Sequence, residues 1–246
     1  MRRLLLNLLI GATLPVTLAG QSLEQRVAAV GNGTARLSFA ARPGVCGSVN
    51  GISLHRSSDE WESDCGPEQV RVALQVAAGQ VVEVRSYVGG RWREGVRATD
   101  LGAANPREAA EYLIRLAERE SELEGDPVLP AALADSITIW PALLKLARSP
   151  TANAEARRRA VFWLGQAAEA AVAPALDSIA ADPRGDREIR KQAVFALSQR
   201  ERNEGVPALI RVARTNPDPE LRKTALFWLG QSEDPRALAL FEEILK

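Results

Sequence analysis

The residue types that could do chemistry gather in one short stretch near the N-terminus. Cys46 and Cys65 are the only two cysteines of this 246-residue chain, and His55 between them is its only histidine. A zinc site would use these side chains, but it is normally marked by a paired Cys-x-x-Cys or a second histidine, and neither is present. A nucleophile would need a base held by a motif, and no motif surrounds His55. We therefore predict no metal, no cofactor and no catalytic residue, hence no enzyme, and we interpret the cysteines as one Cys46–Cys65 disulfide.

Carboxylates lie in the same stretch, at Asp59, Glu60, Glu62 and Asp64. A calcium site is the alternative that they leave open, but the ordered alternation of an EF-hand loop is missing. The sequence after residue 20 also lacks a glycine-rich phosphate-binding loop. We interpret this stretch as a solvated acidic loop.

The first 20 residues have the organisation of a secretory signal peptide. A basic start is followed by an apolar run at residues 4–10 and by small residues up to Gly20. The run is short and is interrupted by Asn7, Gly11 and Pro15, which disfavours a membrane span. A buried N-terminal helix is the alternative. We predict an exported protein, periplasmic or secreted, with no membrane span once residues 1–20 are cleaved.

The charge balance excludes one class of partner. Taking the two arginines of the leader from the 31 basic residues leaves 29, against 31 acidic residues. Domains that bind nucleic acids usually have a clear basic excess. We therefore expect a protein or peptide partner and no nucleic acid.

Residues 21–100 have the pattern of a small mixed domain. A short helix is expected at residues 22–30, ended by glycines. Three segments alternate apolar and polar side chains as strands do, at residues 34–40, 70–76 and 81–88. Gly79 between the last two favours a hairpin. We predict a three- or four-stranded antiparallel sheet with a disulfide-pinned loop. A region of this size should pack against the rest of the chain to complete its core.

A seven-residue segment occurs three times in the C-terminal half. The copies AVFWLGQ, AVFALSQ and ALFWLGQ begin at Ala160, Ala193 and Ala225, which are 33 and 32 residues apart. Such a period is typical of solenoids, in which each helical hairpin buries its apolar face against the next. A Glu-x-Arg pair precedes each copy, and we expect these pairs to form a ladder of ion pairs between repeats. Other helices are expected at residues 105–117, 130–139 and 141–148.

The repeats resemble a known family. The matching residues are the DPELR motif at 218–222 and the Arg-x-x-Ala-x-x-x-Leu-Gly patterns at 157–165 and 222–230. These resemble HEAT repeats, in particular the short HEAT-like repeats of phycobilisome lyases, over roughly residues 125–246. The resemblance implies a right-handed stack of helical hairpins and usually a protein-binding role, but no lyase activity. The predicted fold is α+β, with an all-α solenoid at residues 101–246 after the mixed domain at 21–100.

Each copy also has a face that packing within one hairpin does not explain. On a helix its phenylalanine points about 160° away from the core-facing alanine. A basic residue four positions earlier and a glutamine four positions later share the face of the phenylalanine. The set comprises Arg158, Phe162, Gln166, Lys191, Phe195, Gln199, Lys223, Phe227 and Gln231. We call it the basic-Phe-Gln face and predict that it recognises a polypeptide, such as an extended or acidic segment.

Two alternatives stay open for this face. The phenylalanines could wedge between adjacent first helices as ordinary packing, or the N-terminal domain could dock on the face and cover it. Trp163 and Trp228 are expected in the core, where Ala196 takes the equivalent place in the middle repeat. For function, the sequence favours a binding or scaffold protein of the cell envelope. The alternative is an enzyme, or a subunit of one, that uses the N-terminal domain.

Overall fold

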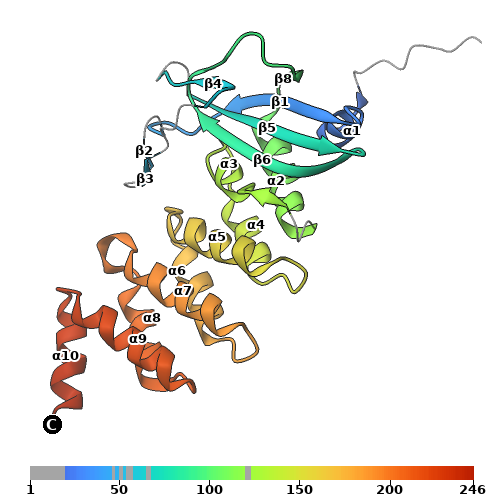
Figure 1. Cartoon of the computed structure of the whole chain (residues 1–246). Coiled ribbons are helices and arrows are strands. Elements are labelled where there is room, and N and C mark those ends of the chain that lie inside the picture. The colour runs from blue at the N-terminus through green and yellow to red at the C-terminus, as the bar shows by residue number, and fades with distance from the viewer. Residues whose placement is uncertain (1–19, 46–47, 50–51, 54–57, 65–67, 120–122) are drawn as a thin grey trace, which may run out of the picture.

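The computed structural model describes residues 20–45, 48–49, 52–53, 58–64, 68–119 and 123–246. A β-sheet forms one end of the molecule, and helical hairpins follow one another away from it to the C-terminus (Figure 1). Residues 1–19, Cys46, Cys65 and His55 lie outside the described residues, so the signal peptide and the disulfide stay predictions. In the described part of the chain, no helix has the length and apolar character needed to cross a membrane.

The centre of the sheet consists of three antiparallel strands, β1 (Gly33–Ala40), β5 (Gln69–Ala77) and β6 (Gln80–Val88). They confirm the three predicted strands. The β5–β6 turn consists of Ala78 and Gly79, with φ angles of 50° and 78°. Two positive φ angles are those of a type I′ turn, whose twist matches the twist of the strands it joins.

Two short strands complete the edges of the sheet, β8 (Thr99–Ala103) and β9 (Glu124–Gly125). β8 runs parallel to β1 and β9 runs parallel to β6, so the order is β8-β1-β5-β6-β9. The prediction of a wholly antiparallel sheet of three or four strands is therefore wrong. A parallel neighbour needs a long connection. Residues 41–98 connect β1 to β8, and the connection from β6 to β9 includes helix α2 (Pro106–Arg119). The division expected at residue 100 falls inside β8.

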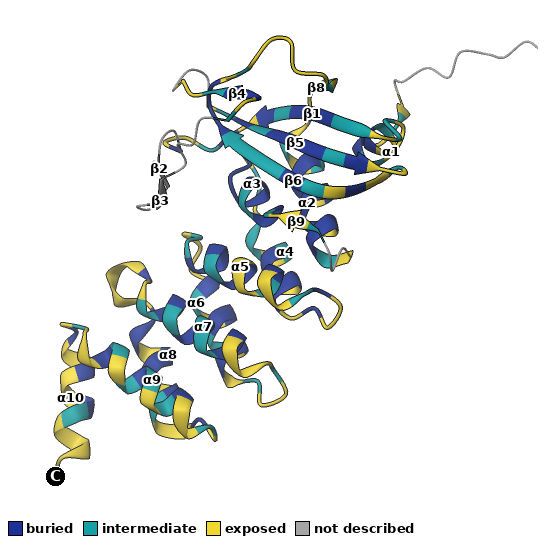
Figure 2. Ribbon diagram, viewed as in Figure 1, coloured by how far each residue is buried: buried dark blue, intermediate teal, exposed yellow. Residues whose placement is uncertain are grey.

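The two faces of the sheet differ in character. On one face, side chains such as Leu37, Val72 and Val84 are buried against α1 (Leu23–Ala28), α2 and α3 (Val128–Ala132). Figure 2 shows this buried layer between the strands and the helices. Helices α2 and α3 also pack on α4 (Trp140–Ala147) and α5 (Ala154–Gly165) of the hairpins. The sheet therefore shares its core with the helical part, as its small size suggests.

The opposite face of the sheet is polar, and two short strands lie beside it. These strands, β4 (Trp61–Glu62) and β7 (Arg91–Trp92), form an antiparallel pair. A second two-stranded pair consists of β2 (Ser48–Val49) and β3 (Ile52–Ser53).

The helices of the C-terminal part begin and end close to the predicted positions. They are α4 (Trp140–Ala147), α5 (Ala154–Gly165), α6 (Val172–Ala181), α7 (Arg187–Ser198), α8 (Val206–Thr215), α9 (Pro219–Gly230) and α10 (Pro235–Ile244), with a short 3₁₀ turn at Glu201–Asn203. The first helix of each repeat begins at a side-chain cap, supplied by Asn153, Asp186 and Asp218, which accept backbone N–H groups. The repeated alanines and leucines are buried between the helices, as predicted.

One predicted helix is shorter than expected. The segment at 130–139 is helical only to Ala132. Ala134 then forms an isolated β-bridge with Ala41, and Ser136 has a φ of 55°, outside the helical range. Ala41 directly follows β1, so this bridge joins the loop to the sheet. The pairing overrides the helical pattern of the sequence.

Two glycines at equivalent positions give a first prediction. At Gly165 an added Cβ would lie 2.9 Å from the Cβ of Ala196 on α7, whereas at Gly230 the nearest atom is 3.8 Å away. Gly165→Ala should therefore destabilise the fold by about 1 kcal/mol, because overpacking outweighs the gain in helix propensity. Gly230→Ala should stabilise it by about 0.5–1 kcal/mol. Urea unfolding of the two variants measures both values, and effects of the same sign would contradict the close approach of α5 and α7.

Candidate functional site

The nine residues of the basic-Phe-Gln face lie on the first helices of the three hairpins, α5, α7 and α9. All nine side chains are half-buried or exposed. None of the nine is fully buried, although Phe162 packs partly against the hydrophobic core. Their surroundings differ from one repeat to the next.

The basic residues of the face are partly neutralised by their own helices. Arg158 pairs with Glu155, and Lys191 pairs with Glu188 at 3.1 Å, in both cases one turn earlier. Lys223 is exposed on α9. Because exposed ion pairs of this kind are screened by water, they add little stability. They do reduce the net positive charge that the face offers to an acidic partner.

The phenylalanines progress from packed to exposed along the stack. Phe162 meets Trp163 of its own helix with ring centroids 5.2 Å apart. Phe195 contacts Trp228 of the next repeat, with ring centroids 5.1 Å apart. This contact is the packing between adjacent first helices that was one of the alternatives for the face. Phe227 also meets Trp228, at 5.0 Å, yet 59 % of its surface is exposed. Packing therefore accounts for Phe195, and it leaves Phe227 facing solvent.

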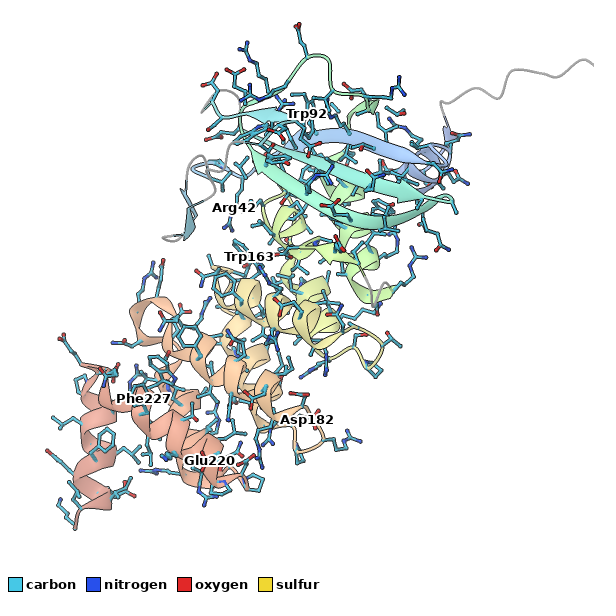
Figure 3. All side chains as sticks on the ribbon, viewed as in Figure 1. Arg42, Trp92, Trp163, Asp182, Glu220 and Phe227 are labelled. Carbon is cyan, nitrogen blue, oxygen red and sulfur yellow. The ribbon has the colours of Figure 1, made fainter. Side chains whose placement is uncertain are left out.

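The N-terminal region reaches the helices at one place near this face. The guanidinium of Arg42 lies 5.9 Å from the ring centroid of Trp163, and the two side chains meet between the sheet and α5 (Figure 3). The backbone N–H of Arg42 donates to the carbonyl of Leu133 at 2.9 Å. Burial lowers the pKa of Arg42. The sheet lies at the far end of the stack from Phe227, so the docking of the N-terminal region concerns the first repeat (Figure 3).

A groove separates the last two hairpins at the ends of their first helices. Its volume is about 320 Å³, and it is lined by Leu197, Leu209 and Trp228 together with polar side chains. Gln199 and Gln231 of the basic-Phe-Gln face are among the latter. The face and the groove are therefore continuous at the C-terminal end of the stack. We call this space the terminal groove.

Trp228 is the residue that sequence reasoning placed least well. The prediction of a core position is confirmed for Trp163, which is 4 % exposed, whereas Trp228 is only half-buried. The signal in the sequence was the change from Ala196 to Trp228 at equivalent positions. Ala196 is buried, whereas the larger side chain of Trp228 is only partly covered, with Phe195 and Phe227 against its ring.

Residues 179–246 match the family model for HEAT repeats. The last hairpins of this chain are HEAT repeats. The match begins in α6, so the equivalent motif on α5 lies upstream of the matched residues. A comparison with curated proteins gave no match to the chain. HEAT repeats often mediate protein interaction, which agrees with the predicted class of partner.

The polar face of the sheet holds a second cluster, around Glu60. Its carboxylate accepts hydrogen bonds from Arg85 at 2.7 Å and from Tyr87 at 2.7 Å, and Arg36 lies 3.8 Å away. Trp92 covers the guanidinium of Arg36 at 4.7 Å. Interpreting this stretch as wholly solvated is therefore wrong for Glu60, which is buried, although Asp59 is exposed.

The chemistry of this cluster is that of a structural ion pair. Burial acts to raise the pKa of Glu60, but hydrogen bonds from Arg85 and Tyr87 outweigh it and hold the pKa below its usual value. Glu60 is thus ionised at neutral pH and is a poor proton donor. Among the described residues, no group of three or more histidine, cysteine or acidic side chains is placed to hold a metal ion.

Proposed function

We propose that the HEAT repeats of this protein hold a polypeptide partner, and that the third repeat supplies the main contact. The observation that carries the proposal is Phe227, a large apolar side chain that is exposed over 59 % of its surface and contacts Trp228, which lines the terminal groove. Exposed aromatic side chains beside a concave surface are typical of binding sites. Lys223 and Gln231 lie one turn before and one turn after it on the same helix face.

The chemistry around Phe227 supports a polypeptide as the ligand. The amides of Gln199 and Gln231 can each donate and accept hydrogen bonds, as the backbone of an extended peptide requires. Trp228 offers an apolar wall for a side chain of the partner. The first two repeats, with Arg158, Phe162 and Gln166, and Lys191 and Phe195, would extend the contact along the stack.

The proposed role is that of a binding or scaffold module, with no reaction step. The proposal includes export, on the strength of the leader at residues 1–20 of the sequence. In that setting the partner would be another exported protein or an exposed segment of one.

Phe227→Ser separates binding from folding. Phage-displayed random peptides selected on the immobilised wild-type protein provide the ligands. Their affinity for Phe227→Ser should fall by at least about tenfold, because an exposed aromatic anchor is lost. The urea midpoint should fall less than that of Phe195→Ser, since most of the Phe227 side chain faces solvent.

Two matched variants complete the test. Phe195→Ser should cost about 1–2 kcal/mol of stability, because Phe195 packs on Trp228. Val82→Ser removes a 42 % exposed apolar side chain from the sheet and should alter neither stability nor binding. If the selection yields no binders, or if Phe227→Ser binds as tightly as wild type, the proposed function is wrong.

A further inference from the structure

Each of the three repeats places one residue at the same point of the turn that follows its first helix. These residues are Ala167, Arg200 and Ser232. Each donates its backbone N–H to the carbonyl of the repeated leucine three positions earlier, at 3.2, 3.3 and 3.1 Å. The backbones are therefore equivalent, and the three repeats differ here in the side chain.

In the middle repeat this side chain fills the space between two hairpins. The buried guanidinium of Arg200 reaches back to the turn of the preceding repeat. Its Nη1 donates to the carbonyls of Gly165, at 3.4 Å, and of Ala167. Its Nη2 donates to the carbonyl of Glu169 at 3.4 Å and to the carboxylate of Glu204 at 2.6 Å. Main-chain carbonyls at the end of a helix thus gain a cationic donor.

One repeat later the same space is open. The carbonyls of Ser198 and Arg200 are the counterparts of those of Gly165 and Ala167, 33 residues on. Ser232, which stands where Arg200 stood, is too short to reach them, and its hydroxyl accepts the N–H of Asp234 at 3.2 Å. The terminal groove lies here, and both Ser198 and Ser232 line it.

The outer part of this space already has an arginine. Helix α8 begins 34 residues after α6, so Asn203 corresponds to Glu169 when counted from the second helices. The carbonyl of Asn203 accepts Nη2 of Arg236 at 3.2 Å, as the carbonyl of Glu169 accepts Arg200. The other two carbonyls, those of Ser198 and Arg200, have no corresponding donor side chain on the turn of the third repeat, because Ser232 stands in place of the arginine.

We propose that the terminal groove takes an arginine side chain of the bound polypeptide, in the place that Arg200 occupies one repeat earlier. This inference rests on the proposed function and names the chemistry of the bound residue. The guanidinium donates to the carbonyls of Ser198 and Arg200, and the ring of Trp228 offers it a cation–π contact. The carboxylate of Glu233, which also lines the groove, supplies the opposite charge.

The groove is suited to a cation and, more narrowly, to a guanidinium. Of the described residues that line it, none is a lysine or an arginine, and Glu233 is the charged one. The planar fork of a guanidinium can donate to two neighbouring carbonyls at once, which a lysine ammonium does less well. The acidic segment considered from the sequence alone would instead place a carboxylate against these carbonyl oxygens. The inference therefore replaces that part of the expectation at this end of the face.

The test uses the full chain and the peptides selected on it. We expect the selected peptides to share an arginine, and we expect its replacement by citrulline, which has the same shape without the charge, to weaken binding at least about tenfold. Ser232→Arg should fill the groove from within, abolish the binding and raise the thermal midpoint. Ala239→Arg adds the same charge at an exposed site on α10 outside the groove and should leave binding unchanged.

The outcomes separate this inference from the proposed function. If peptides bind equally well with citrulline, or bind Ser232→Arg as tightly as wild type, the arginine site is wrong, while a loss on Phe227→Ser would still uphold polypeptide binding. If no peptide is selected, ethylguanidinium is titrated while the indole N–H of Trp228 is followed by NMR. A saturable shift that Ser232→Arg abolishes supports the site, and the absence of such a shift overturns it.

Discussion

Replacing Glu60 by alanine is expected to destabilise the protein by about 3 kcal/mol, because it leaves buried positive charge without its partner. The carboxylate is the common acceptor for Arg85 and Tyr87, and Arg36 lies beside it with its side chain almost fully buried. Both Nε and Nη2 of Arg36 are buried without a hydrogen-bond partner among the described residues. Glu60 is thus the nearest compensation for that charge. Its loss would therefore destabilise the whole polar face of the sheet.

Urea unfolding measures this loss, and Glu62 provides the control. Glu62 pairs with Arg91 at 2.9 Å on the neighbouring strands, but the side chain of Arg91 is 74 % exposed. Glu62→Ala should therefore change stability by less than about 1 kcal/mol. Equal effects of the two substitutions would show that burial does not decide the strength of these pairs.

The contribution of Glu60 should also depend on pH in a defined direction. Its pKa is lower in the folded protein than the usual glutamate value of about 4.3. A lowered pKa means that the stabilisation is fully present above the unfolded value and is lost as the pH falls through the folded value. The difference in stability between wild type and Glu60→Gln should therefore shrink below about pH 4.

The sequence was informative about the hairpins because their signals are local. The period of 33 and 32 residues, the capping residues and the helix-spaced alanines and leucines all act within one repeat or between neighbours. The central strands were equally local, since alternation and a Gly79 turn specify a hairpin. The edge strands were not predictable in the same way. β8 and β9 are short and polar, and each pairs with a strand that lies far from it in the sequence.

The candidate site was predictable in position but not in character. The repeat register placed Phe227 and Gln231 on an outward face, which the structure agrees with. The phenylalanines differ in how far they are covered: Phe195 meets Trp228 of the next repeat, whereas Phe227 meets Trp228 of its own helix and is 59 % exposed. In the terminal groove, Ser232 and Trp228 stand where the preceding repeat has Arg200 and Ala196. The effect of such differences on the exposure of a side chain or on a groove becomes visible only when the repeats are compared in three dimensions.

The predicted ladder between repeats exists for the arginines of the Glu-x-Arg pairs. Arg157 lies 3.9 Å from Asp186, and Arg190 lies 3.8 Å from Asp218, in each case the capping residue of the next first helix. The glutamates behave differently from the prediction, because Glu155 and Glu188 pair with basic residues of their own helices. Within these pairs it is therefore the arginine column, Arg157 and Arg190, that reaches the next hairpin.

Arg190 is the strongest link of this column, and its replacement by alanine should cost about 3 kcal/mol. Its Nη2 donates to Asn216 at 3.0 Å and its Nε to the carbonyl of Ala180 at 3.3 Å, with only 6 % of the side chain exposed. Asn216 is buried as well and donates to the same carbonyl at 3.1 Å. Removing the guanidinium leaves the oxygen of Asn216 with less compensation and opens a space between the second and third repeats.

Arg187 is a matched control on the same helix, because it pairs with the same carboxylate. Its Nε lies 2.9 Å from Asp218, closer than Arg190, yet 61 % of its side chain is exposed. If distance governed stability, Arg187→Ala would be the more damaging change. Because water and salt screen exposed ion pairs, we expect Arg187→Ala to destabilise the protein by less than about 1 kcal/mol. Urea unfolding of the two variants decides between these accounts, and a larger effect at Arg187 would contradict the role of the buried arginine in joining the repeats.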